Sequence, residues 1–152
     1  ANAKLEYGDG YFARGLASRL SGPPVPDNIV ISGVRSTAER DAIEDVFGDV
    51  TTIAIWTLPN ERLKRLKERE GDYSIDEFNE RKSRELWQWG CIDFYTEEGE
   101  ADYIIPNNFE KSVFEADIER ITDYIVNDGE SKKFGSTPFD DYDNKYVASQ
   151  FL

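Results

Sequence analysis

An arginine placed directly after a short apolar run is the first residue of this chain that could do chemistry. Residues 28–34 form a β-branched run, and Arg35 follows it. Near its end, Gly33 would let a ligand approach the backbone closely, and a guanidinium can donate two parallel hydrogen bonds to a phosphate. We therefore interpret Gly33 and Arg35 as candidates for phosphate binding. The alternative for Arg35 is an ion pair with Glu39 or Asp41.

Three further arginines lie on two charged segments with helical spacing. Arg69 ends the first segment, and Arg81 and Arg84 lie one turn apart on the second. Guanidinium groups match phosphate oxygens well, so these residues could neutralise a phosphorylated ligand. Arginines on charged helices are also commonly solvated or paired, and Arg81 has Glu77 and Glu85 four residues away on either side. Both interpretations stay open from the sequence.

Amide side chains follow the last apolar run, residues 101–106. Asn107 and Asn108 come directly after Pro106. An amide both donates and accepts hydrogen bonds, so side chains at this point could bind the edge of a nucleobase. We therefore predict that Pro106, Asn107 and Asn108 line the nucleotide side of a site.

Apolar runs and capping signals predict the elements that position these residues. Short apolar runs around Val30, Ile53 and Ile104 are typical of buried strands. Phe12, Leu16 and Leu20 stand at every fourth position of residues 11–20, which predicts one apolar helix face there, and the charged segment 61–70 predicts a further helix. The predicted capping boxes, each opening a further helix, are Ser36–Glu39, Ser74–Glu77 and Ser112–Glu115. The second of these helices is expected to run to about Trp89, and the third places Phe114, Ile118, Ile121 and Ile125 on one apolar stripe.

Strands that alternate with helices predict an α/β fold, a three-layer sandwich in which the three strands are adjacent and parallel. Ligands bind at the carboxyl ends of the strands in such sheets. We therefore expect Arg35, Arg69, Arg81 and Arg84 to converge on one cleft there when a nucleotide or phosphate binds. That expectation competes with separate surface pairs to glutamates.

The overall charge excludes several classes of partner. The 152 residues carry 18 basic and 31 acidic side chains, a formal net charge of −13. This charge repels nucleic-acid phosphates and anionic lipid surfaces, so we expect no nucleic-acid partner and no membrane partner. The chain shows no apolar run of membrane-spanning length and no signal peptide, which predicts a cytoplasmic protein.

Histidine is absent, and Cys91 is the single cysteine. These counts exclude Ser-His-Asp and Cys-His catalysis, histidine-based metal sites and an internal disulfide. We therefore expect no resident metal site. Methionine is absent as well and the chain opens with Ala1, which predicts a processed or truncated N-terminus.

The order of these motifs resembles that of the P-loop nucleotide kinases, most closely the archaeal group similar to dephospho-CoA kinase and adenylate kinase. The resemblance covers about residues 8–126. The run 29–35 is similar to that family's strand ending in Asp-Gly-x-Arg, and segments 65–69 and 80–90 resemble the entry and the helix of its lid. Residues 101–107 resemble its last strand.

The resemblance implies a kinase-like domain over residues 1–126, with a helical lid at about 69–100. The implied activity is ATP-dependent phosphoryl transfer with Mg²⁺ to a nucleoside monophosphate or dephospho-CoA. Gly33 and Arg35 would hold this phosphorylated acceptor. The residues that the resemblance implicates in catalysis are Arg69, Arg81 and Arg84, and those at the nucleotide are Pro106, Asn107 and Asn108.

Two departures from that family bear on activity. The phosphate-binding sequence G-x-x-x-x-G-K-[ST] is absent, and the family carries it on a strand that would lie upstream of this chain. Ser32 also stands where the family usually has Asp. We therefore expect ATP and Mg²⁺ as cofactors only if a further segment completes the site, and otherwise none.

Three hypotheses follow. The chain is one part of a kinase whose phosphate-binding loop lies on a missing N-terminal piece, or a kinase-derived pseudoenzyme that serves as a binding or structural subunit, or an unrelated α/β interaction domain. The first two imply a protein partner, namely the missing piece or a second copy. Residues 127–152 are polar with spaced aromatics, and we predict an extended tail that docks on its own domain or on a partner.

Overall fold

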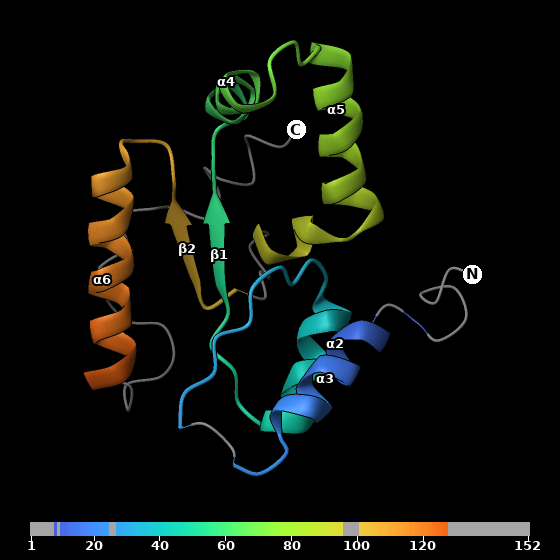
Figure 1. Cartoon of the computed structure of the whole chain (residues 1–152), viewed down its shortest axis with the longest axis vertical. Helices are drawn as coiled ribbons and strands as arrows, with labels where there is room; N and C mark the ends of the chain where they lie inside the picture. Colours follow the sequence, from blue (N-terminus) through green and yellow to red (C-terminus); the bar gives the residue numbers. More distant parts are fainter. Residues whose placement is uncertain (1–7, 9, 25–26, 96–100, 128–152) are drawn as a thin grey trace.

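The computed structural model describes residues 8, 10–24, 27–95 and 101–127. The predicted tail lies outside the described residues, except for Asn127. Within the described part the chain forms five α-helices, two strands and two short helices of other types (Figure 1). Their bounds are α2 Tyr11–Leu20, α3 Thr37–Phe47, β1 Ile53–Trp56, α4 Pro59–Glu70, α5 Ile75–Ser83, the π-helical turn η1 Arg84–Gln88, the 3₁₀-helix η2 Cys91–Tyr95, β2 Tyr103–Pro106 and α6 Lys111–Asn127.

Strands β1 and β2 are parallel neighbours, which confirms the prediction for two of the three apolar runs. Ile53 aligns with Tyr103, and Trp56 with Pro106. The amide of Asn107 extends the ladder by donating to the Trp56 carbonyl at 2.6 Å. A parallel pair needs a long crossover connection, and α4 and α5 belong to it. The described residues therefore form an α/β structure with a small parallel sheet.

The third predicted strand does not form in the described part of the chain. Residues 28–34 do not form a strand, and Val30 is 95% exposed. At the edge of β1 that faces away from β2, the Ile55 carbonyl accepts a hydrogen bond from the Tyr95 hydroxyl at 2.9 Å instead of one from a neighbouring strand. The prediction of three adjacent strands is therefore wrong here. An apolar run shows that burial is favourable, but a strand also needs a neighbour with free backbone groups.

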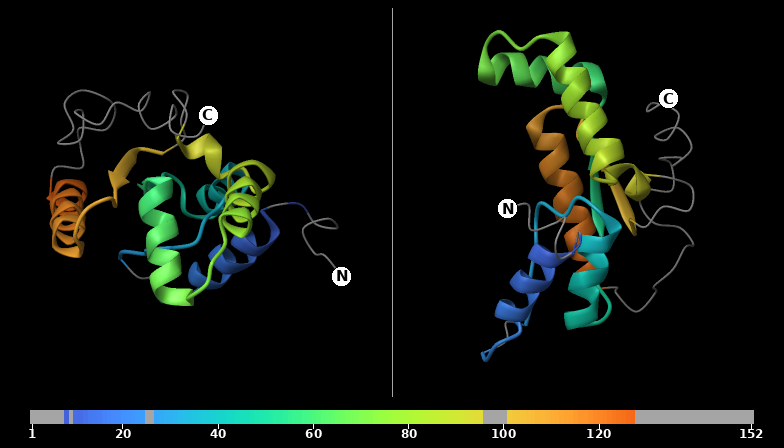
Figure 2. Two further views of the ribbon diagram at one scale, coloured as in Figure 1. Left: turned by 90° about the horizontal axis from the view of Figure 1, so that it is seen from above. Right: turned by 90° about the vertical axis from the view of Figure 1, so that its right-hand side faces the viewer.

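The two faces of the sheet are covered by different elements. On one face, Ala54, Trp56 and Ile104 pack with Phe94 of η2 and Ala101 in one apolar cluster. On the other face, α6 lies along β2, as Figures 1 and 2 show. Helix α5 lies on the side of β1 away from β2 (Figure 1). Helical elements therefore cover both faces of β2 but only one face of β1.

Helix α6 packs on β2 through the predicted apolar stripe. Ile121 and Ile105 are fully buried against each other, and Phe114, Ile118 and Ile125 pack around them. This confirms the predicted stripe. The helix begins at Lys111, so Ser112 lies inside its first turn and is not the predicted N-cap.

Helices α2 and α3 pack through small residues rather than through the predicted apolar face. Ala17 and Ala42 are buried, whereas Phe12 and Leu16 of the predicted face are exposed. A Cβ atom at Gly10 would lie 2.7 Å from the Ala38 carbonyl oxygen, so glycine permits the close approach. The apolar spacing of residues 11–20 identified helix α2. The small side chains of Ala17 and Ala42 determined which face of α2 contacts α3.

Candidate functional site

A pocket opens at the carboxyl end of β1, where α4 begins. Figure 1 shows α4 and α5 beyond this end of the strand. The pocket has a volume of about 240 Å³, and we call it the sheet-end pocket. The described residues that line it are Ile55, Trp56, Thr57, Pro59, Arg62, Phe78, Lys82, Glu85, Leu86, Cys91 and Tyr95.

Local sequence signals fix the two helices that border this pocket. Pro59 stands in the first turn of α4, where a missing amide hydrogen costs nothing, and Leu66 anchors the helix in the core. At the start of α5, Ser74 and Glu77 form the predicted capping box. The Ser74 hydroxyl accepts from the Glu77 amide at 3.1 Å, and the Glu77 carboxylate accepts from the Ser74 amide at 3.0 Å.

The helix predicted to run to Trp89 changes type before its end. It is α-helical through Ser83 and then makes one π-helical turn, in which the Trp89 amide donates to the Arg84 carbonyl at 3.0 Å. A π-turn inserts one extra residue into a helical turn and is found frequently at functional sites. Here the π-helical turn carries Glu85, which contacts Arg62 and Arg81.

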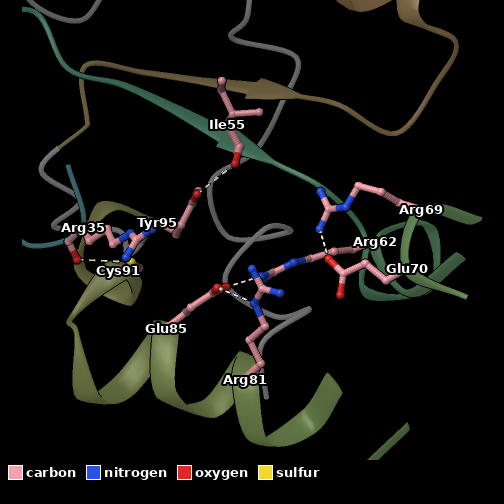
Figure 3. A network of polar contacts seen from close by, with 9 residues as sticks. All are labelled: Arg35, Ile55, Arg62, Arg69, Glu70, Arg81, Glu85, Cys91 and Tyr95. Carbon is pink, nitrogen blue, oxygen red and sulfur yellow. Dashed lines mark hydrogen bonds and ion pairs between the residues drawn. The ribbon is translucent and has the colours of Figure 1, made fainter. Parts of the chain in front are cut away.

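Glu85 joins two arginines from different helices, and we call this arrangement the Glu85 bridge. Its carboxylate pairs with Arg62 of α4, and it accepts from Nε of Arg81 of α5 at 3.1 Å (Figure 3). The Glu85 side chain is 19% exposed. Burial acts to raise the pKa of its carboxyl, but the hydrogen bonds and charges of Arg62 and Arg81 outweigh burial and lower that pKa. The carboxylate is therefore held in its charged form.

A second pocket borders the first and contains three of the four predicted arginines. We call it the arginine pocket. It has a volume of about 390 Å³. The described residues that line it are Arg35, Tyr73, Glu77, Glu80, Arg81, Arg84, Glu85 and Trp89. Arg35 thus comes together with Arg81 and Arg84, although about fifty residues separate them in the chain.

Each of these arginines already has a partner. The Arg35 guanidinium carbon lies 4.7 Å from the centroid of a Trp89 ring, a cation–π geometry. Arg84 pairs with Glu80 at 2.6 Å, and Arg81 pairs with Glu85. Hydrogen bonds to Tyr73 and to Glu85 raise the pKa of Arg81. The surface pairs weighed for Arg81 and Arg84 therefore form along one helix, yet both side chains still line the pocket.

Arg35 contacts Glu39, one of the two partners that the sequence offered, through its backbone. The Arg35 amide donates to the Glu39 carboxylate at 2.8 Å. Ser36 caps α3 by accepting from the Glu39 amide at 3.2 Å. The thiol of Cys91 donates to the Arg35 carbonyl at 3.1 Å, and burial raises the pKa of that thiol. Two backbone contacts thus fix the position of Arg35.

Arg69 does not line either pocket. It pairs with its neighbour Glu70 at the end of α4, and its side chain is 65% exposed. Gly33 is exposed with a φ of +86°, a backbone conformation that favours glycine, in the segment just before Arg35. The structure therefore keeps Arg69 apart from the three arginines that it brings together.

The asparagines after β2 connect the sheet to α4. Asn108 Oδ1 accepts from the Leu58 amide at 2.6 Å, and Asn107 Oδ1 accepts from Arg65 at 3.0 Å. Pro106 is buried as the last residue of β2. These side-chain oxygens are engaged within the protein, at the same end of the sheet as the pockets.

Sequence reasoning did not select Arg62, Lys82 or Tyr95 as site residues. Arg62 lies one turn before Arg65 on α4, and the i, i+3 spacing of the two basic residues was the available signal. The contact of Arg62 with Glu85 spans 23 residues, so no local pattern could reveal it. Tyr95 carries no motif and is found only from its contact with β1.

Removing the amide of Asn108 should lower stability. In Asn108→Ala the Leu58 amide loses its partner at the start of α4, and we expect the free energy of unfolding to fall by about 1–2 kcal/mol. Asn108→Asp keeps an acceptor oxygen and should retain most of that stability. Urea denaturation followed by circular dichroism measures both. Equal losses in the two variants would contradict this role.

Tyr95 should make stability depend on pH in the alkaline range. Burial raises the pKa of its hydroxyl from 10.0 to about 12. The folded state then holds the proton more tightly than the unfolded state. Stability therefore falls as pH rises from about 10 towards about 12, by roughly 2–3 kcal/mol in total. Tyrosinate absorbance during an alkaline titration should show the ionisation of Tyr95 as a step near pH 12.

The matched controls replace single tyrosines by phenylalanine. Tyr95→Phe should remove the late step, whereas Tyr11→Phe, at an exposed position of α2, should leave it in place. If the late step persists in Tyr95→Phe, the assignment is wrong.

Comparisons with known proteins identify one distant relative. The chain is 30% identical over 103 aligned residues to UPF0200 protein TK1334 of Thermococcus kodakarensis. The match covers 64% of this chain and 54% of that protein, so the chain spans about half the length of its relative. The similarity supports a distant relationship, and the relative's name assigns no activity.

No protein-family model matches the chain, and no solved structure matches it. Among the described residues, no group of three or more Cys, Asp or Glu side chains could hold a metal ion. No helix in that same part of the chain is long and apolar enough to cross a membrane.

Proposed function

We propose that this chain is the lid- and acceptor-bearing part of a nucleotide kinase-like protein, which binds a phosphorylated nucleotide at the carboxyl end of its sheet. Phosphoryl transfer from ATP with Mg²⁺ would require a further segment that supplies the phosphate-binding loop. The acceptor class follows the resemblance, a nucleoside monophosphate or dephospho-CoA. The chain by itself would bind but not catalyse.

One observation carries this proposal: Arg35 lines one pocket with Arg81 and Arg84, although about fifty residues separate it from them in the chain. In a protein of net charge −13, this lining balances three guanidinium groups against the three carboxylates of Glu77, Glu80 and Glu85, so the pocket is locally neutral. Phosphate is the ligand that such groups match best, because its oxygens accept paired hydrogen bonds. The pocket also contains Tyr73 and Trp89, whose rings offer stacking surfaces to a base.

The position of the pockets supports the same proposal. Helices α4 and α5 follow the carboxyl end of β1 and project past it (Figures 1 and 2). Ligands of open parallel sheets bind at this end, and phosphoryl transfer depends mainly on positioning and dispersed positive charge. In the resemblance, the corresponding segment is the lid.

The incomplete cover of β1 supports the need for a further segment. Ile53 and Ile55 are 37% and 47% exposed, on the face where α6 covers only β2. The Ile55 carbonyl at the outer edge accepts from a side chain, Tyr95. An added strand could pair with this edge after displacing the Tyr95 hydroxyl, and an added helix could cover the two isoleucines.

Calorimetric titration of the chain with AMP and with ATP plus Mg²⁺ tests nucleotide binding. We expect Arg35→Ala and Arg84→Ala each to weaken binding at least tenfold, about 1.4 kcal/mol, because each removes one charged donor from the pocket. Arg120→Ala on α6 is the matched control. Its side chain is about as exposed as that of Arg84 but lies outside both pockets, so its affinity should equal the wild type.

The absence of nucleotide binding, or equal affinities in all three variants, would overturn the proposal. Circular dichroism of each variant establishes that a lost affinity is not a lost fold.

The second candidate function is a kinase-derived subunit without catalysis, which docks a partner. Ser32, in place of the acid expected by resemblance, favours this alternative because a carboxylate for Mg²⁺ or the acceptor is missing. The coding sequence upstream of the Ala1 codon separates the two candidates. An in-frame strand followed by G-x-x-x-x-G-K-[ST] would favour the kinase, and its absence would favour the subunit.

A further inference from the structure

We propose that Glu85 is a built-in competitor of the phosphate ligand, which binds only after displacing the Glu85 carboxylate from Arg62 and Arg81. The inference rests on the proposed function and adds a form of regulation to the same site. Weakly binding anions would not displace an internal carboxylate of this kind from the arginines, whereas a polyanionic ligand would.

The geometry places Glu85 where a ligand would be expected. Its two oxygens contact guanidinium groups from two different helices, one from α4 and one from α5. A carboxylate and a phosphate present similar oxygen acceptors to a guanidinium. Glu85 therefore occupies the acceptor position between Arg62 and Arg81, and Figure 3 shows both contacts converging on it.

Glu85 is the acid that the two pockets share, and it contacts two arginines. Among the described residues that line the sheet-end pocket, Glu85 is the only acid, and the cations of that lining are Arg62 and Lys82. Glu85 also lines the arginine pocket. The other two acids of that pocket have partners of their own, because Glu77 caps α5 and Glu80 pairs with Arg84.

A phosphate ligand would replace Glu85 as the partner of Arg62 and Arg81 rather than add a new partner. The two arginines are held in place by Glu85 before any ligand arrives, so a ligand gains only the difference between its contacts and those of Glu85. Like charges close to each other also repel, and the ligand and Glu85 are both anionic. Removing the charge of Glu85 should therefore increase affinity for a phosphate ligand.

The experiment measures binding of pyrophosphate to the full chain by calorimetry. Glu85→Gln keeps the size and an acceptor oxygen but removes the charge. We expect it to bind pyrophosphate at least tenfold more tightly than the wild type. Asp117→Asn is the matched control, since it removes the charge of a similarly buried acid that pairs with Arg120 outside both pockets, and its affinity should change less than about threefold.

The gain must depend on the arginines that Glu85 occupies. Adding Arg62→Ala to Glu85→Gln should cancel the tenfold gain. If Glu85→Gln does not fold by circular dichroism, Glu85→Asp replaces it. The aspartate side chain is one methylene shorter and should lose one of the two guanidinium contacts. We therefore expect Glu85→Asp to bind pyrophosphate about threefold or more tightly than the wild type, a change typical of losing one partly exposed ion pair.

The outcomes separate this inference from the proposed function. Pyrophosphate binding that is equal in wild type and Glu85→Gln, but lost in Arg35→Ala or Arg84→Ala, overturns the competitor role and leaves the proposed function standing. No pyrophosphate binding to any variant overturns this inference, and it overturns the proposed function as well only where AMP and ATP also fail to bind. A gain in Glu85→Gln that survives Arg62→Ala also overturns the inference, because the freed arginine would not be its cause.

Discussion

Ile121→Ala should destabilise the protein more than any exposed substitution. Ile121 is fully buried between α6 and β2, opposite Ile105, which is also fully buried. The substitution removes buried apolar atoms and leaves a cavity, for which the expected cost is about 2–5 kcal/mol. That is a large part of the stability of a typical domain. Urea denaturation followed by circular dichroism measures the loss as a lower midpoint.

The control makes the same chemical change where the side chain is exposed. Ile75 at the start of α5 is 59% exposed, and Ile75→Ala should cost less than about 0.5–1 kcal/mol. Equal losses at positions 75 and 121 would contradict the packing of α6 on the sheet. An unchanged midpoint for Ile121→Ala would do so as well.

Phosphoryl transfer by the chain alone should stay at the background rate. The sequence contains no G-x-x-x-x-G-K-[ST] segment to supply backbone amides and a lysine to the β- and γ-phosphates. Removing even one preorganised donor of this kind typically costs about 3–4 kcal/mol of transition-state stabilisation. The loss of a whole loop should therefore leave no measurable rate.

A coupled assay for ADP, with AMP or dephospho-CoA as acceptor, measures this rate. An authentic adenylate kinase added to the same mixture establishes that the assay responds. ADP release well above background that disappears in Arg81→Ala would contradict the prediction, because it would assign catalysis to this pocket without the loop.

Features of the fold that depend on neighbouring residues could be predicted from the sequence. Ser74 and Glu77 cap α5 as expected, because both partners of a capping box lie within one helical turn. The stripe that includes Ile118 and Ile121 was also predicted, because the helical period alone places these side chains on one face. The parallel pairing of β1 and β2 followed from the helices between them.

Features that depend on distant partners could not be predicted. The run 28–34 contains the β-branched apolar residues Ile29, Val30, Ile31 and Val34, but pairing depends on which backbone edge lies beside it, and the outer edge of β1 meets Tyr95. Similarly, the helical period of residues 11–20 could not show that α2 would pack through small residues. Side-chain volume on the opposing helix decided that contact.

The sequence by itself determined the chemistry that is present: arginines on charged helical segments, no histidine, one cysteine and no phosphate-binding loop. Only the tertiary structure decided which charges meet. It brings Arg35 to Arg81 and Arg84, leaves Arg69 outside, and places Glu85 between Arg62 and Arg81. Composition and local spacing fix residue types and helical faces, whereas an ion pair across 23 residues depends on how α4 and α5 pack over the end of β1.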